Sequence, residues 1–267
     1  MLRLLRAAID TYRTDGGVST FRQGVRHIHT KEIPGLIRWI RYTIRRLKYH
    51  DAAPKSTQLL HIQPEQVKYV VWPGFYSDLS REYTHIRSGT WDKSIVQEET
   101  GHWDNFDRRS LIPFEKYTPY RSFVEHFRYG APWEETDYFK NATSDPERDR
   151  LGTTSSPRWE KFEQWDDVYE SMKEEGYKIK EDRSMSLFNS PGDEILIDIG
   201  RDGQLILDEG RHRLMIAKIL GINQIPVRVL VRHEQWQNRK EAFLSSKKSS
   251  DYSQELSNHP DLKPLLS

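Results

Sequence analysis

The order of apolar and polar positions predicts a compact unit in the C-terminal half of the chain. Residues 195–200 and 204–208 are two apolar runs joined by an Arg-Asp-Gly turn, a pattern typical of a β-hairpin. Apolar residues at helical spacing then predict a helix over 211–220. The run "IPVRVLV" at 225–231 predicts a buried strand. The order hairpin, helix, strand indicates a small mixed sheet covered by helices.

Upstream of the hairpin, residues 159–175 predict another helix, with Gly176 as its C-cap. Between residues 72 and 139 the chain carries 16 of its 31 aromatic residues. Such density is compatible with a stacking surface for bases. The i, i+4 spacing of Phe123 and Phe127 favours a layer of the core.

The N-terminal residues form a basic arm. Apolar stripes predict helices over 2–14, 18–30 and 34–48. Residues 1–56 hold twelve Lys/Arg and four Asp/Glu, so their charge is 12 − 4 = +8, and the remaining chain carries 1 − 8 = −7. Three interpretations stay open: a helical hairpin packed on the body, an interfacial helix on anionic lipid, or an arm along nucleic acid.

These patterns predict an α+β fold, a small mixed sheet with helices preceded by the basic arm. Four segments are expected: the arm (1–56), an aromatic-rich α/β segment packing on the core (57–158), the core (159–235), and a C-terminal helix with a loose tail (236–267).

The composition indicates where in the cell the protein is expected. Cysteine is absent, which excludes disulfides and thiolate chemistry. No apolar run is long enough to span a membrane, and no secretory signal is evident. We therefore expect a cytoplasmic protein, peripheral at the membrane if the arm binds lipid.

The junction between the predicted strand and helix, Asp-Glu-Gly-Arg-His-Arg at 208–213, concentrates the candidate chemistry. A helix N-terminus presents unpaired N–H groups and a partial positive charge, which favour an anion. Gly210 allows close approach of the backbone, and Arg211 and Arg213 can each fork onto phosphate oxygens. The junction therefore predicts a site for phosphate or nucleotide.

The acidic residues of the junction would repel a bare phosphate. Asp208 and Glu209 suit a divalent metal bridging the phosphate, or a base near a hydroxyl nucleophile. His212 would orient the reacting groups. The alternative is structural: Asp208 caps the helix, Glu209 pairs with Arg213, and His212 packs.

The region 160–233 resembles the ParB/sulfiredoxin-like superfamily. ParB N-terminal domains combine a helix of the type L-x-x-S-I-x-x-x-G with a G-E-R-R-x-x-A-A-x-x-x-G helix and an I-P-V strand. The matching residues are Tyr169, Ser171, Met172 and Gly176, then Gly210, Arg213, Ala217 and Gly221, then Ile225, Pro226 and Val227. His212 and Arg213 also match the G-C-H-R turn of sulfiredoxins and the D-G-H-H-R type of free serine kinases.

The departures from these families limit the resemblance. Arg211 stands where sulfiredoxins have their nucleophilic cysteine, which excludes sulfinate reduction. ParB's upstream arginine motif and a downstream helix-turn-helix are not evident. The resemblance implies a turn that binds a nucleotide or phosphate. The junction itself motivates the first hypothesis, an enzyme that binds a nucleoside triphosphate with Mg²⁺ for phosphoryl transfer or hydrolysis. The alternative is a non-catalytic module that binds nucleic acid through residues 1–56.

A repeated Gly-x-Trp-Asp pattern at 89–92 and 101–104 offers two further carboxylates, Asp92 and Asp104. They could add ligands to the site, but Trp-Asp turns are commonly structural, so both interpretations stay open.

Overall fold

The computed structural model describes residues 42–55, 58–76, 79, 84–97, 109–143, 158–178, 194–246 and 254–266. The predicted helices 2–14 and 18–30, and Asp104, lie outside the described residues. No helix in the described part of the chain is both long enough and apolar enough to span a membrane.

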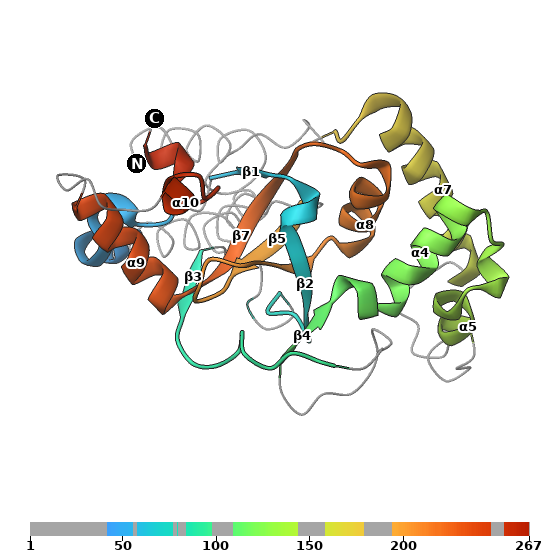
Figure 1. The fold of residues 1–267 in the computed structure, drawn as a ribbon, viewed down its shortest axis with the longest axis horizontal. Coiled ribbons are helices and arrows are strands. Elements are labelled where there is room, and N and C mark those ends of the chain that lie inside the picture. The colour runs from blue at the N-terminus through green and yellow to red at the C-terminus, as the bar shows by residue number, and fades with distance from the viewer. Residues whose placement is uncertain are drawn as a thin grey trace, which may run out of the picture.

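A mixed sheet forms the centre of the molecule (Figure 1) and confirms the predicted α+β class. Its strands run in the order β1-β7-β5-β6-β2-β4. β1 pairs with the first residues of β7, and β3 pairs with the last residues of β7. The strands are β1 Leu60–Ile62, β2 Val67–Trp72, β3 His85–Arg87, β4 Ser110–Pro113, β5 Ile195–Ile199, β6 Leu205–Glu209 and β7 Ile225–His233. The strands of the 57–158 segment therefore join the same sheet as the predicted core.

The predicted hairpin, helix and strand are confirmed. β5 and β6 pair antiparallel, and β5 and β7 pair parallel. A β-bulge interrupts the hairpin near its open end: Leu196 pairs with Glu209 and Ile197 with Leu207, so Asp208 has no residue opposite it. A bulge re-aims the side chain it displaces. This irregularity places Asp208 where the candidate site begins.

The two faces of the sheet differ in what covers them. Ile195, Ile197 and Ile199 belong to the main apolar core, beneath the helices. Leu196 lies on the other face, with Phe75 from the loop after β2. This alternation follows from the period of two in a β-strand.

Helices gather around α8 at one end of the sheet (Figure 1). The helices there are α4 Thr118–Tyr129, α5 Asp137–Thr143, α7 Arg158–Glu175 and α8 Arg211–Leu220. Short 3-10 turns, η3 Pro64–Gln66, η4 Phe114–Lys116 and η5 Trp133–Glu135, connect neighbouring elements. Phe123 is fully buried and Phe127 packs against the same core, so the prediction of an aromatic core layer is confirmed.

The other end of the sheet carries α9 Glu234–Ser245, α10 Gln254–Ser257, η6 Lys263–Leu265 and the turn η2 His50–Ala52. The prediction of a loose C-terminal tail is wrong for residues 254–266. Leu256 and Leu262 are buried in the main core, and Asp261 is fully buried. Asp261 binds Arg232 of β7 through two hydrogen bonds, from Nε at 2.9 Å and Nη2 at 2.6 Å. An ion pair between residues distant in the sequence therefore fixes a segment whose local pattern is polar.

Candidate functional site

The turn between β6 and α8 has the geometry expected of a strand delivering a glycine to a helix. Gly210 has φ 84° and forms the N-cap of α8. A Cβ at this position would lie 2.9 Å from the Cα of Ile195. Both the left-handed backbone and the close packing against β5 therefore require glycine.

The N-terminus of α8 has no side-chain cap in the part of the chain that the structure describes. The prediction that Asp208 caps the helix is therefore wrong. The first intrahelical bond runs from the N–H of Leu214 to the carbonyl of Gly210, at 3.2 Å. The N–H groups of the first turn precede the intrahelical hydrogen bonds and lie at the positive end of the helix dipole.

Arg211 places a buried guanidinium beside this helix terminus. Its Cζ lies 5.5 Å from the centroid of the Trp72 ring. Burial raises the pKa of Tyr117, and the positive charge of Arg211 partly offsets that increase. The Nε of Arg211 and the hydroxyl of Tyr117 are both buried, and neither has a hydrogen-bond partner among the described residues. The tyrosine hydroxyl, which can donate or accept, lies close enough to the guanidinium that each changes the pKa of the other.

His212 belongs to an aromatic stack. Its ring lies 3.9 Å from that of Trp165, centroid to centroid, with an interplanar angle of 20°. The Nε2 atom is 3.0 Å from the hydroxyl of Tyr138, whose pKa is raised by burial. Phe123 stacks on the ring as well, at 5.7 Å. Packing and the hydrogen bond with Tyr138 therefore fix the orientation of the histidine.

Asp208 is directed at the loop after β2. Its carboxylate accepts hydrogen bonds from the N–H groups of Phe75, at 2.5 Å, and Tyr76, at 3.0 Å. Burial raises the pKa of Asp208 to about 6, and these two N–H groups oppose the increase. Asp198 of β5 is fully buried nearby, and burial followed by the charge of Asp208 raises its pKa well above the usual range. The pair thus favours one shared proton and holds the loop onto the sheet.

Glu209 is half-buried and remains next to the helix terminus. Its Oε1 accepts a hydrogen bond from the N–H of Gly210 at 3.0 Å, and its charge acts on both Arg211 and Tyr117. No cluster of three His, Asp or Glu side chains able to hold a metal occurs in the described ranges. Mg²⁺ is commonly held by one or two carboxylates together with substrate phosphates and water. Of the two acidic residues predicted as metal ligands, Glu209 is the one that suits this mode.

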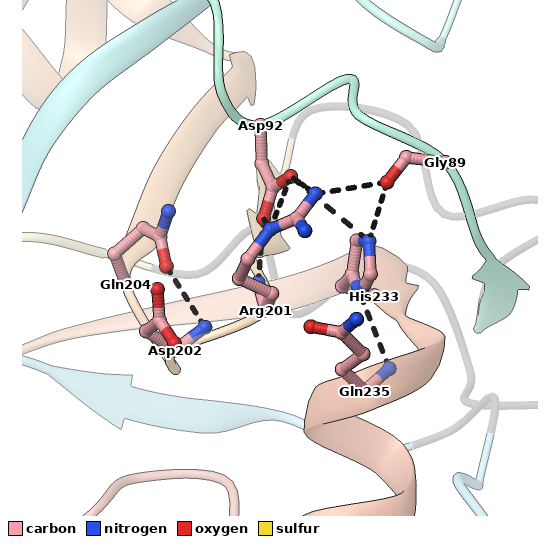
Figure 2. A network of polar contacts seen from close by, with 7 residues as sticks. All are labelled: Gly89, Asp92, Arg201, Asp202, Gln204, His233 and Gln235. Atoms are coloured by element: carbon pink, nitrogen blue, oxygen red, sulfur yellow. Dashed lines mark hydrogen bonds and ion pairs between the residues drawn. The ribbon is translucent and has the colours of Figure 1, made fainter.

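Asp92, from the Gly-x-Trp-Asp pattern, is part of a separate network (Figure 2). Its carboxylate pairs with the guanidinium of Arg201, with Nη2 to Oδ1 at 2.5 Å and Nε to Oδ1 at 3.0 Å. Nη2 of Arg201 and Nε2 of His233 both donate to the carbonyl of Gly89, at 2.8 and 3.0 Å. Nδ1 of His233 accepts from the N–H of Gln235, which assigns the proton to Nε2. Asp92 is thus occupied in joining its loop to the β5–β6 turn.

The structure brings Glu209, Gly210 and Arg211 together and directs Asp208 to the loop on the sheet's other face. The half-buried Arg213 lies on the first turn of α8. Three neighbours of the site, Trp72, Tyr117 and Tyr138, were not predicted. All three come from the aromatic-rich segment. For the two tyrosines, the polar hydroxyl within an apolar segment was the sequence feature that could have indicated a place in the site.

Comparisons with protein-family models, with curated proteins and with solved structures gave no match to this chain.

Proposed function

We propose that the β6–α8 turn binds the phosphate groups of a nucleoside triphosphate. The observation that carries this proposal is the buried Nε of Arg211, which lacks an acceptor among the described residues and lies beside the uncapped N-terminus of α8. Backbone N–H groups, a guanidinium and the helix dipole all favour the same ligand, a multiply charged oxyanion. Arg213, on the same turn, adds a second guanidinium that solvent reaches.

A nucleotide fits this turn better than a bare inorganic anion. The negative charge of Glu209 would repel an isolated phosphate, but it would favour a phosphate chain that carries Mg²⁺. Trp72 and Trp165 are partly exposed residues next to the turn, and we propose that one of their rings contacts the base. The resemblance of residues 160–233 to the ParB/sulfiredoxin-like superfamily also favours a nucleoside triphosphate.

We further propose phosphoryl transfer or hydrolysis as the chemistry of this site. Glu209 is the acidic residue on the ligand side, suited to hold Mg²⁺ or to accept a proton from the attacking hydroxyl or water. His212 acts as a positioning residue because its ring packs against both Trp165 and Phe123. Asp208 supports the site indirectly, by fixing the loop after β2.

Isothermal titration with ATP, CTP and GTP in the presence of Mg²⁺ tests the proposal. We expect at least one nucleotide to bind, and Arg213→Ala to weaken its affinity about tenfold or more, because a hydrogen bond to a charged group is worth about 1.5–3 kcal/mol. Arg239→Ala, an exposed arginine on α9, is the matched control and should bind as wild type does. No binding of any nucleotide, or equal binding by Arg213→Ala and wild type, would refute the proposal.

A further inference from the structure

The helix over residues 42–49, which leads into η2, docks on the body through its aromatic face. Tyr49 is buried, and Tyr42 packs in the same cluster as Ile86 of β3 and Leu244 of α9. Arg45 donates from Nη1 to the hydroxyl of Thr84 at 2.8 Å. Tyr42, Arg45 and Tyr49 are spaced i, i+3 and i+7, so these three contacts come from one side of the helix.

The opposite side of this helix exposes its aliphatic residues. Ile44 is 59% exposed and Leu47 is 77% exposed, whereas most other large aliphatic side chains in the described part of the chain are buried. They are three positions apart and therefore neighbours on the helix surface. Arg46 and Lys48, both exposed, flank them. Lys48 forms a surface ion pair with Glu234 at 3.3 Å, and its Nζ lies 4.9 Å from the centroid of the Tyr49 ring. The face thus combines two aliphatic side chains with two cations.

We infer that this face, Ile44, Arg46, Leu47 and Lys48, binds the surface of an anionic lipid bilayer. An interfacial helix buries apolar side chains at the headgroup boundary and directs its cations at anionic lipids. The charge is complementary: residues 1–56 carry 12 − 4 = +8. Each basic residue close to an anionic membrane contributes to binding, and the contribution falls off within a Debye length. In Figure 1 the helix lies beside α9, at the end of the sheet remote from α8. Membrane binding would therefore leave the β6–α8 turn accessible.

Co-sedimentation of the full chain with phosphatidylserine-containing vesicles at low salt tests this inference. We expect wild type to sediment with these vesicles and to stay in the supernatant with pure phosphatidylcholine. The double variant Ile44→Ser/Leu47→Ser should bind at least about tenfold more weakly, because two side chains lose their burial in the interface. Arg46→Glu should weaken binding at low salt, since it reverses one charge.

Both substituted positions are exposed, so the double variant should keep the wild-type circular dichroism and unfolding midpoint. Tyr129→Ser is the matched control, because Tyr129 is 78% exposed but belongs to α4, at the other end of the sheet. It should sediment as wild type does. Wild type that stays in the supernatant with anionic vesicles overturns the inference, as does equal binding by the double variant.

Two other results would assign the face or the arm to a different partner and overturn the inference. Self-association of wild type that Ile44→Ser/Leu47→Ser abolishes would show that a second copy covers the face. Salt-sensitive binding to duplex DNA, without binding to anionic vesicles, would assign the basic arm to nucleic acid.

Discussion

Arg232 and Arg211 both bury a guanidinium, but their surroundings differ. Arg232 forms two hydrogen bonds to the carboxylate of Asp261, and that carboxylate also binds Lys240 at 3.2 Å and the indole N–H of Trp236 at 3.1 Å. Arg211 forms no ion pair with a described carboxylate, and its Nε has no acceptor in the described part of the chain. A partnerless nitrogen does not by itself distinguish the two, since Nη1 of Arg232 also lacks a hydrogen-bond partner among the described residues. The difference is the carboxylate: Asp261 pairs with Arg232, whereas no described carboxylate forms an ion pair with Arg211.

This difference separates a structural charge from a candidate binding charge. A buried cation is costly unless an anion and hydrogen bonds compensate for its lost hydration. At Arg232 the protein supplies that compensation with a residue of its own C-terminal segment. At Arg211 we expect a ligand to supply it. The comparison therefore predicts that breaking the first cluster affects stability, whereas breaking the second affects binding.

The largest loss of stability is expected when the ion-pair cluster of Asp261, Arg232 and Lys240 is broken. Asp261→Ala leaves Arg232 and Lys240 buried without their counter-charge, which should lower the free energy of unfolding by about 3–5 kcal/mol. Equilibrium denaturation in urea measures this change. Asp167→Ala, an exposed aspartate of α7, should change stability by no more than about 0.5 kcal/mol. A loss at Asp261 as small as that of the control would contradict the view that this ion pair fixes the C-terminal segment.

A smaller change in stability is expected at the buried carboxylate pair, Asp198 and Asp208, whose charges have the same sign. The folded-state pKa of Asp208 is about 6, raised from 3.8, so this residue stabilises the fold most below pH 3.8 and its contribution is lost as pH rises through 6. Asn does not titrate. Between pH 4 and pH 7 the stability of wild type, measured relative to Asp208→Asn, should therefore fall by about 2 kcal/mol.

Urea denaturation at a series of pH values gives this difference directly. Asp167→Asn serves as the control, and its stability should stay parallel to that of wild type across the same range. Parallel curves for wild type and Asp208→Asn would contradict the raised pKa.

The sequence predicted the parts of the fold that local pattern determines. The hairpin, α8 and β7 are each marked by apolar periodicity and by turn residues such as Gly210. The C-terminal segment was missed because its burial depends on Asp261 and Arg232, which are 29 positions apart. A single buried aspartate in a polar stretch has the same local pattern as an exposed one.

For the candidate site, the sequence predicted the turn but not the directions of its side chains. The β-bulge that re-aims Asp208 toward Phe75 depends on the register of β5 against β6, which no local pattern records. Tyr117 and Tyr138 reach the site from a segment about 70 to 90 residues earlier in the chain, so only the fold brings them to Arg211 and His212.

The smallest effect on stability is expected for substitution of Arg211, and comparison with the same substitution at Arg232 distinguishes the roles of the two arginines. Arg211→Met removes a buried charge that forms no ion pair with a described carboxylate, and it keeps an apolar side chain of similar length. The free energy of unfolding should therefore change by less than about 1 kcal/mol. Arg232→Met leaves the carboxylate of Asp261 with fewer partners in a fully buried position and should cost several times more. Urea denaturation of both variants, with titration of the nucleotide that wild type binds, completes the comparison. If Arg211→Met loses stability as Arg232→Met does while it still binds nucleotide, then the guanidinium of Arg211 is structural and the ligand does not compensate its charge.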